Sequence, residues 1–277
     1  MTFDLKTYQT TLQNLPDYQK LLLQVPLYIF DSIPSTNQRL WQLIDEGKQL
    51  PMAAIALQQT AGRGQWGKIW HSSLGGLYLS LGIPRSGCCR TAPHLSLNDN
   101  FHLTMATAWG IANALRTYRL PVLLKWPNDL ILEGRKLGGI KIETRTQQQQ
   151  ITDAVIGVGI NWTNPVPDVG INLQSFYEKV EPAIASLEQL AGIVICGILA
   201  GYEHYLTLGI EQLLADYQKL LFNLGQKVSI EGCKGVVTGV TIKGQLRIAL
   251  QSPGATTEIC LLPGQIHLGY AGTEFNK

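Results

Sequence analysis

The sequence lacks the composition of several large classes of protein. Its five cysteines are an odd number without a Cys-x-x-Cys pair, so they indicate neither a zinc site nor a disulfide framework. Charged residues make up 15% of the chain and hydrophobic residues 45%, which is typical of a globular protein rather than a disordered one. With 22 basic and 20 acidic residues the net charge is only +2, so no overall field favours a polyanion or a membrane surface.

Targeting and membrane features are also missing from the sequence. The N-terminus has neither the basic start nor the apolar stretch of a signal peptide. No apolar run approaches the ~18 residues that a membrane helix needs. We therefore predict a cytoplasmic protein.

The length of 277 residues allows a large domain with a small appendage. Apolar spacing at Leu12, Leu15 and 21–23 predicts a short N-terminal helical extension, ended by Pro26. The pattern then divides the chain into three parts: an extension over 1–26, a large central domain over 27–224 and a small β domain over 225–277. Glycine and proline turns separate the short apolar runs of the last part, which predicts a compact barrel or sandwich.

Strand and helix patterns alternate irregularly in the middle part. Ser35 with Gln38 forms a capping box that predicts the start of a helix, and Gly47 its end. The predicted strands are 27–30, 53–58, 76–82, 122–126, 129–132, 137–144 and 153–160, and further helices are predicted over 100–118 and 186–223. Short connections between the strands after residue 122 require antiparallel pairing. The predicted fold class is α+β, with a mixed, largely antiparallel sheet and flanking helices.

A glycine-rich segment at 62–67 satisfies the pattern Gly-x-Gly-x-x-Gly of dinucleotide sites. That fingerprint needs a helix at the glycines and an acidic residue about 20 positions later, whereas here a strand pattern follows and no acidic residue occurs before Asp99. We interpret the segment as a loop whose backbone N–H groups, with Arg63 and Lys68, approach phosphate oxygens. The alternative is a flexible surface loop.

Two further clusters carry charge close to strand ends. Lys125-Trp126-Pro127-Asn128-Asp129 combines a cation, an amide and a carboxylate, a composition suited to phosphate, magnesium and an adenylate. Its alternative is an ordinary turn. The segment 135–140, Arg-Lys-Leu-Gly-Gly-Ile, has paired glycines that allow a ligand to approach the backbone closely. The alternative is the basic end of a hairpin, whose charges prevent pairing with another strand edge.

Five motifs in chain order carry a family resemblance. They are Ser35-Thr36-Asn37, Gln59-Thr60-x-Gly62-Arg63-Gly64, Lys125-Trp126-Pro127-Asn128-Asp129, Arg135-Lys136-Leu137-Gly138-Gly139-Ile140 and Gly157-Val158-Gly159-Ile160-Asn161. This series resembles the motif set of the biotin protein ligases that modify acetyl-CoA carboxylase, in the monofunctional form without an N-terminal DNA-binding domain. The resemblance implies a class II synthetase-like catalytic domain followed by an SH3-like β-barrel.

The resemblance also implies an activity. Biotin and ATP would give biotinyl-5'-AMP with the help of Mg²⁺, and biotin would then pass to a lysine of the biotin carboxyl-carrier domain of acetyl-CoA carboxylase. Such a site must neutralise phosphate charge, which explains cation clusters rather than a nucleophilic triad. A lipoate or octanoate ligase is an alternative within the fold, and a biotin-responsive DNA-binding repressor is one from another class. About thirty residues precede Ser35, too few for a helix-turn-helix domain, so no DNA binding is expected. The oligomeric state stays open, including a homodimer.

By the same resemblance, the catalytic residues would be Arg63, Lys125, Asp129 and Lys136. The ligand-binding residues would be Ser35, Thr36, Asn37, Gln59, Arg63, Gly64, Gln65, Trp70, Asn128, Lys136, Gly138 and Asn161, and the magnesium ligands Asn128 and Asp129. The first four would bind the biotin ring, Arg63, Gly64 and Lys125 the adenylate, and Lys136 the reacting carboxylate and phosphate. Asp129 would steer or deprotonate the incoming lysine amine, and Trp70 would stack on adenine unless it is a core residue.

Two positions depart from the family pattern. Gln65 stands where an arginine commonly follows Gly-Arg-Gly, and this loop is understood to close over the adenylate. Gly269 stands where an arginine often follows the leucine near the C-terminus. We therefore expect weaker retention of the adenylate, with Trp66 compensating by packing the loop closed.

Overall fold

A computed structural model of the chain describes residues 2–14, 25–84, 100–252 and 255–270. The helices are α1 (Leu5–Gln13), α2 (Thr36–Asp45), α3 (Asn100–Thr117), α4 (Leu173–Tyr177) and α5 (Leu187–Lys219), and a 3₁₀ turn lies at Gln65–Gly67. The strands are β1 (Leu27–Ile33), β2 (Met52–Gln59), β3 (Gly76–Pro84), β4 (Leu123–Lys125), β5 (Asp129–Leu132), β6 (Arg135–Gln147), β7 (Gln150–Asn161), β8 (Lys227–Ile230), β9 (Cys233–Val240), β10 (Leu246–Ser252) and β11 (Ala255–Leu261).

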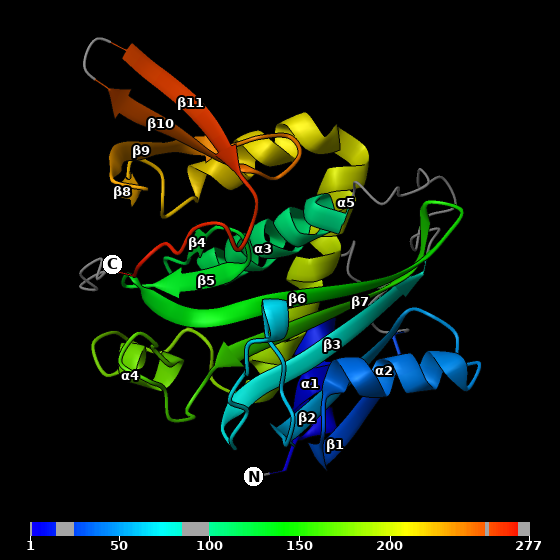
Figure 1. Ribbon diagram of the computed structural model, residues 1–277. Helices are drawn as coiled ribbons and strands as arrows, with labels where there is room; N and C mark the ends of the chain where they lie inside the picture. The colour runs from blue at the N-terminus through cyan, green and yellow to red at the C-terminus, as the bar shows by residue number, and fades with distance from the viewer. Residues whose placement is uncertain (1, 15–24, 85–99, 253–254, 271–277) are drawn as a thin grey trace.

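A seven-stranded sheet forms the centre of the molecule (Figure 1). Its strand order is β1-β2-β3-β7-β6-β5-β4, and only the β1–β2 pair is parallel. The parallel pair is possible because α2 forms the crossover between its strands. The predicted α+β class with a largely antiparallel sheet is confirmed.

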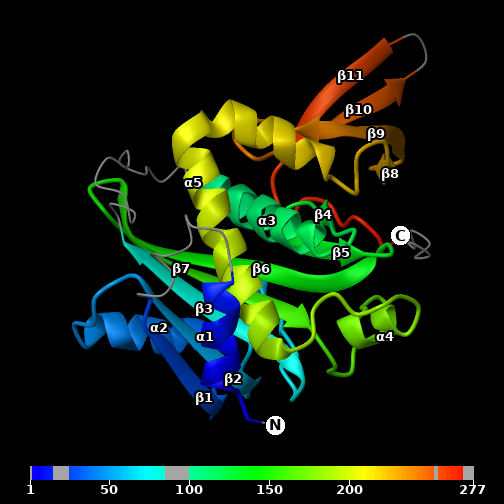
Figure 2. The ribbon, with the colours of Figure 1, turned by 180° about the vertical axis from the view of Figure 1, so that it is seen from behind.

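Helices cover both faces of this sheet. Alternate residues of β2 pack against the helices on the two faces. Ala53, Ile55 and Leu57 belong to the main core, which includes α1, α3 and α5. Met52 and Ala54 face the opposite way, into a smaller core with Leu40 and Leu43 of α2. Successive side chains of a strand point to opposite faces, so a nearly continuous apolar run marks a strand buried on both sides. Figure 2 shows α1, α3 and α5 in front of the sheet.

Close packing joins α3 to α5. A Cβ at Gly110 would overlap the carbonyl oxygen of Gly197, and one at Gly201 would overlap that of Ala106, so only glycine permits this approach. The expectation that no apolar run approaches membrane length was wrong, because an 18-residue window in α5 has a mean hydropathy of 1.5. This apolarity has a packing role: α5 buries residues such as Ile193, Val194 and Ile198 in the main core.

The C-terminal strands form a separate four-stranded sheet in the order β11-β10-β9-β8, with antiparallel pairing. Trp126 Nε1 donates to the Gly244 carbonyl at 2.9 Å, which ties this sheet to the turn after β4. His102 Nε2 lies 2.8 Å from the Ile242 carbonyl and adds a link to α3. A small C-terminal β unit is therefore present, whereas its closure into an SH3-like barrel and the three-part domain division stay predictions.

Local details differ from the predicted elements. Ser35 is the N-cap of α2, but its side chain makes no capping hydrogen bond, so the predicted capping box does not form. The turn at Gly47 is present, with φ +81°. In the N-terminal segment, α1 ends at Gln13 and buries Tyr8 and Leu12 near α5; Leu15 and 21–23 lie outside the described residues.

Candidate active site

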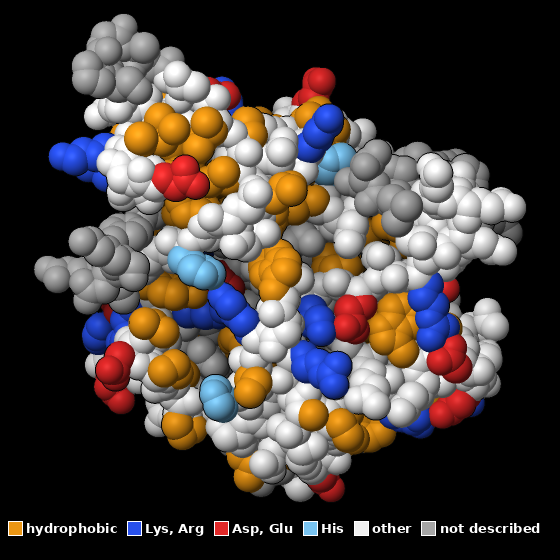
Figure 3. All heavy atoms as spheres, in the orientation of Figure 1, with side chains coloured by type: hydrophobic (Ala, Val, Ile, Leu, Met, Phe, Trp, Pro, Cys, Tyr) orange, Lys and Arg blue, Asp and Glu red, His pale blue; other side chains and the backbone are white. Residues whose placement is uncertain are grey.

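A cavity of about 870 Å³ lies among the described residues. The start of α2, the glycine-rich loop, the β4–β5 turn, β6, β7 and the chain after β11 line it. Figure 3 shows Lys and Arg side chains gathered around a hollow below the C-terminal sheet. The predicted site residues that line this cavity are Ser35, Thr36, Asn37, Gln59, Arg63, Gly64, Gln65, Trp70, Lys125, Asn128, Asp129 and Lys136.

Uncharged polar side chains form one end of the cavity, which we call the neutral end (Thr36, Asn37 and Gln59). The amide N–H and the hydroxyl of Thr36 donate to Gln59 Oε1 at 2.8 and 3.2 Å. Ser80 of β3, fully buried, donates to Asn37 Oδ1 at 2.6 Å. Because their partners belong to the protein, these side chains are oriented before a ligand arrives.

A half-buried carboxylate supports the neutral end from behind. Glu143 Oε2 accepts from Asn37 Nδ2 at 3.0 Å and from Trp41 Nε1 at 3.2 Å, and Lys141 pairs with Glu143 Oε1 at 3.0 Å. Burial alone would raise the pKa of Glu143, but these donors outweigh it and hold that pKa below its ordinary value. Glu143 therefore stays ionised and keeps Asn37 oriented.

Two glycines of β7 let side chains lie flat on the sheet. A Cβ at Gly157 would overlap Asn37 Oδ1, and one at Gly159 would overlap Trp70 Nε1. Glycine inside a strand marks such close approach. The Gly-Val-Gly pattern of β7 therefore forms the floor of the cavity.

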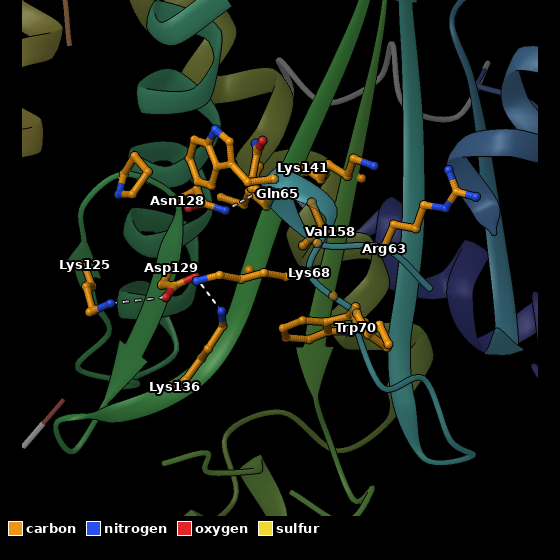
Figure 4. Close-up of a pocket in the computed structure, with 18 of the residues that line it drawn as sticks. Arg63, Gln65, Lys68, Trp70, Lys125, Asn128, Asp129, Lys136, Lys141 and Val158 are labelled. Atoms are coloured by element: carbon orange, nitrogen blue, oxygen red, sulfur yellow. Dashed lines mark hydrogen bonds and ion pairs between the residues drawn. The ribbon is translucent and has the colours of Figure 1, made fainter. Parts of the chain in front are cut away.

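The opposite end, which we call the charged end, consists of Lys125, Asp129 and Lys136. The β4–β5 pairing sets Lys125 across from Asp129, and Lys136 reaches Asp129 from β6 after a register shift between Leu130 and Ile131. Lys136 Nζ lies 2.7 Å from Asp129 Oδ1, and Lys125 Nζ lies 3.7 Å from Oδ2 (Figure 4). Two ammonium groups thus share one carboxylate, which leaves the charged end cationic.

Burial strongly affects Lys125, whose side chain is only 11% exposed. Desolvation lowers the pKa of Lys125 from 10.5, and the nearby cations Lys136 and Lys68 lower it further, while the Asp129 carboxylate opposes these effects. Burial first, and repulsion among the lysines second, therefore destabilise the charged form of Lys125. An anionic ligand that entered here would relieve this repulsion.

The glycine-rich loop differs from the phosphate cradle predicted from its sequence. The Gly64 N–H donates to the Lys68 carbonyl at 2.7 Å, and the Trp70 N–H donates to the Gly62 carbonyl at 3.0 Å. These two backbone donors are engaged within the loop, whereas the cationic side chains of Arg63 and Lys68 line the cavity and are suited to phosphate. Arg63 is exposed and lies across the cavity from the charged end, whereas Lys68 extends towards Asp129 (Figure 4).

Trp70 lies at the junction between the two ends. Its indole packs on Gly159, and Lys136 Nζ lies 5.3 Å from the ring centroid. Its Nε1–H is buried and has no protein partner. Buried donors are normally paired, so this indole is a candidate ligand contact rather than a core tryptophan alone.

Three other predicted residues have structural roles. Asn128 lines the cavity, yet its Nδ2 donates to the Ile140 carbonyl at 2.7 Å and fixes the turn. Gly138 and Asn161 do not line the cavity. Gly138 approaches the Gly159 carbonyl of the neighbouring strand, and Asn161 donates to the carbonyls of Lys136 and Ile171 at 3.3 Å. Asn161 can therefore hold the β6 end that carries Lys136.

Several cavity residues were missed by the sequence interpretation of binding and catalytic residues. They are Lys141, His267 and Tyr270, together with Ser80 behind the neutral end. Trp66, which was expected to pack the loop closed, also lines the cavity. Lys68, which was predicted to approach phosphate oxygens, lines the cavity as well. Tyr270 is 141 positions from Asp129, but its hydroxyl donates to Asp129 Oδ2 at 2.6 Å. No local pattern around Tyr270 points to this contact.

Known proteins share this arrangement of elements. Bifunctional ligase/repressor BirA of Escherichia coli (strain K12) is 32% identical over 191 residues, covering 68% of this chain and 57% of that protein. BirA of Bacillus spizizenii is 24% identical over 214 residues, covering 76% of this chain and 63% of that protein. The chain thus spans less than two thirds of the length of these relatives.

The fold similarity extends further than the sequence similarity. The structure of biotin protein ligase from Aquifex aeolicus in complex with biotin and ATP matches with a TM-score of 0.62 at 22% identity, covering 85% of this chain and 99% of that one. Residues 29–161, which contain both ends of the cavity apart from the C-terminal tail, match the biotin/lipoate A/B protein ligase family. Through this domain, the chain belongs to the biotin/lipoate A/B protein ligase family.

Proposed function

We propose that the protein is an ATP-dependent, AMP-forming ligase that converts biotin to biotinyl-5'-AMP and transfers biotin to a lysine of a carboxylase carrier domain. The observation that carries this proposal is the combination of a neutral end and a charged end in one cavity. The neutral end offers hydroxyl and amide groups that match the donors and acceptor of a urea ring. The charged end offers two ammonium groups to a carboxylate and a phosphate.

In the first step, a biotin carboxylate oxygen attacks the α-phosphorus of ATP. A new P–O bond forms, the bond to the β-phosphate oxygen breaks, and the electron pair leaves with pyrophosphate. Both reactants are anions, so Lys136 and Lys125 would reduce their repulsion and stabilise charge on the α-phosphate. Arg63 and Lys68 would hold the remaining phosphates, and Trp70 would contact the nucleotide.

In the second step, a lysine amine attacks the acyl carbon of the adenylate. A C–N bond forms, the C–O bond to the phosphate breaks, and AMP leaves with the electron pair. The amine must lose a proton, and Asp129 is the carboxylate placed to accept or steer it. The products are the amide and AMP, without a covalent enzyme intermediate.

Magnesium is expected from the resemblance, but the proposed ligands do not fit a protein cage for it. Asp129 Oδ1 pairs with Lys136, and Oδ2 accepts from Tyr270 and lies near Lys125. The described residues contain no group of three His, Cys, Asp or Glu side chains able to hold a metal ion. Asp129 is therefore a poor metal ligand in this arrangement, because both of its carboxylate oxygens already have protein partners.

The proposed partners follow the same family. The acceptor is the biotin carboxyl-carrier domain of acetyl-CoA carboxylase, and the location is the cytoplasm. The extension, catalytic domain and small β domain are proposed to be the three units of the chain. The absence of DNA binding stays a prediction that a gel-shift assay with and without biotin and ATP tests.

Biotin-dependent exchange of labelled pyrophosphate into ATP tests the proposal. Exchange should require biotin and should stop when biotin is omitted. Lipoate and octanoate in place of biotin test the alternative ligase within the family, because their acyl chains lack the urea group that the neutral end matches. Exchange with lipoate or octanoate but not with biotin would overturn the proposed substrate.

A further inference from the structure

The chain after β11 returns to the large sheet and brings Tyr270 to the charged end (Figure 1). Leu268 is only 7% exposed and belongs to the main core, so the tail is anchored two residues before Tyr270. Tyr270 OH donates to Asp129 Oδ2 at 2.6 Å, and the ring centroid lies 4.3 Å from Lys125 Nζ. One side chain therefore contacts both a cation and the carboxylate of the site.

The two contacts are different interactions. The hydroxyl makes a directional hydrogen bond to Asp129 Oδ2, while Lys136 occupies Oδ1. Together these donors define the orientation of the carboxylate. The ring instead faces the Lys125 ammonium and partly replaces the water that burial has removed.

Tyr270 acts as a donor rather than as an acid or base. Burial raises the pKa of Tyr270, and the charge and hydrogen bond of Asp129 raise it further, so the phenol stays protonated. Asp129 in turn accepts a hydrogen bond from a group that does not ionise under working conditions. This contact can orient Asp129 at any pH at which the enzyme functions.

We propose that Tyr270 is a positioning residue with two separable halves: its ring holds Lys125 for adenylate formation, and its hydroxyl holds Asp129 for transfer to the amine. This inference rests on the proposed ligase function. Adenylate formation needs a fixed cation beside the phosphate but no proton acceptor. Transfer needs a fixed carboxylate beside the amine, because the amine must lose a proton as the C–N bond forms and AMP departs.

Two substitutions separate the halves. Tyr270→Phe keeps the ring and removes the hydroxyl, so pyrophosphate exchange should remain within about twofold of the unmodified protein, while transfer from preformed biotinyl-5'-AMP should fall about tenfold or more. Tyr270→Ala removes both halves, so exchange should also fall about threefold to tenfold. Rescue of exchange but not of transfer by Phe is a result that a purely structural role for Tyr270 would not produce.

Transfer is measured in single turnovers with a recombinant apo biotin carboxyl-carrier domain, and the maximal rate is separated from the carrier concentration at half-maximal rate. Tyr270→Phe should lower the maximal rate of transfer and leave the carrier concentration at half-maximal rate unchanged. Tyr78→Phe is the matched control, since its hydroxyl is also lost from a buried position, where it donates to the Ser73 carbonyl at 2.6 Å outside the cavity. This control should leave both half-reactions unchanged.

The outcomes distinguish the inference from the proposed function. No biotin-dependent exchange in the unmodified protein would overturn the proposed function itself. Normal exchange in the unmodified protein, with transfer by Tyr270→Phe equal to or faster than normal, would overturn only the role of the hydroxyl. An equal loss in both half-reactions for Tyr270→Phe would overturn the separation into two halves.

Discussion

The two ends of the cavity are built on opposite physical principles. At the neutral end, Thr36, Asn37 and Gln59 are fixed by hydrogen bonds to one another or to fully buried Ser80. At the charged end, two lysines share one carboxylate, and burial lowers the pKa of Lys125. The neutral end is satisfied without a ligand and can select a shape. The charged end has excess positive charge and favours anionic groups.

The largest expected effect comes from breaking the charged end at Lys136. Lys136→Ala removes the cation nearest Asp129, so biotin-dependent pyrophosphate exchange should fall about 10²-fold to 10³-fold. Lys179→Ala is a matched control, because Lys179 pairs with Glu133 on the surface and is 60% exposed. Near-normal exchange in a folded Lys136→Ala protein would contradict the role of the charged end.

Substitutions at the neutral end should change the binding of biotin rather than the rate of the reaction. Gly157→Ala places a Cβ against Asn37 Oδ1 and displaces it, so the KM for biotin should rise about tenfold while the KM for ATP changes little. Gly159→Ala displaces the Trp70 indole instead, so it should raise the KM for ATP more than that for biotin. The same change in both constants for both variants would remove the distinction between the two ends.

The glycine-rich loop lies beside both ends of the cavity. Substitutions in this loop therefore test how tightly the protein retains biotinyl-5'-AMP. Gln65→Arg restores a charge-assisted contact worth about 1 kcal/mol, so release of biotinyl-5'-AMP should slow about fivefold to tenfold. Trp66 is 56% exposed and lines the cavity, so its ring has room to fold over a ligand. Trp66→Ala should therefore accelerate release, by more than any change at Gln65.

Off-rates of the adenylate from the unmodified protein and the two loop variants decide this point. An unchanged off-rate in Trp66→Ala would remove the compensating role of the indole. A faster off-rate in Gln65→Arg would reverse the charge argument.

The smallest expected effect is a shift in pH dependence. Adenylate formation needs Lys125 charged, and burial lowers the pKa of Lys125 from 10.5. Exchange should therefore be lost as pH rises through this lowered pKa, earlier than for an exposed lysine. Lys125→Arg keeps its charge to higher pH, so the alkaline limit of its exchange activity should move upward, even if its maximal rate is lower. An alkaline limit at the same pH in both proteins would exclude Lys125 as the titrating group.

Strands and helices with strong local patterns were predictable from the sequence. The predicted strand 129–132 is β5 with the same bounds, and the predicted helix 100–118 is α3 within one residue. The ends of β6 and β7 were less predictable, because both strands extend into polar residues beyond the apolar pattern. The apolar length of α5 was underestimated because Glu203 and His204 interrupt the run.

The candidate site was predictable where its residues lie close together in sequence. Lys125, Asp129 and Lys136 lie in one cluster of antiparallel strands, so their meeting follows from short connections. Gly138 lies outside the cavity lining although the next residue, Gly139, belongs to it, because neighbouring residues of a strand face opposite sides of the sheet. Asn161 also lies outside the lining, at the end of β7, where its side chain donates to the Lys136 and Ile171 carbonyls. Motif membership therefore does not fix the direction of a side chain.

The sequence by itself determined the α+β class, the antiparallel region after residue 122 and the chemical types of the site, since these depend on residue patterns within short segments. Only the tertiary structure decided that the amides of Gly64 and Trp70 are engaged within the loop. It also decided that Ser80 supports Asn37 and that Tyr270 reaches both Lys125 and Asp129. The physical reason is distance along the chain. These contacts form when the main core anchors Leu268 and the β3–β7 pairing fixes the floor of the cavity, and neither constraint leaves a pattern in the local sequence.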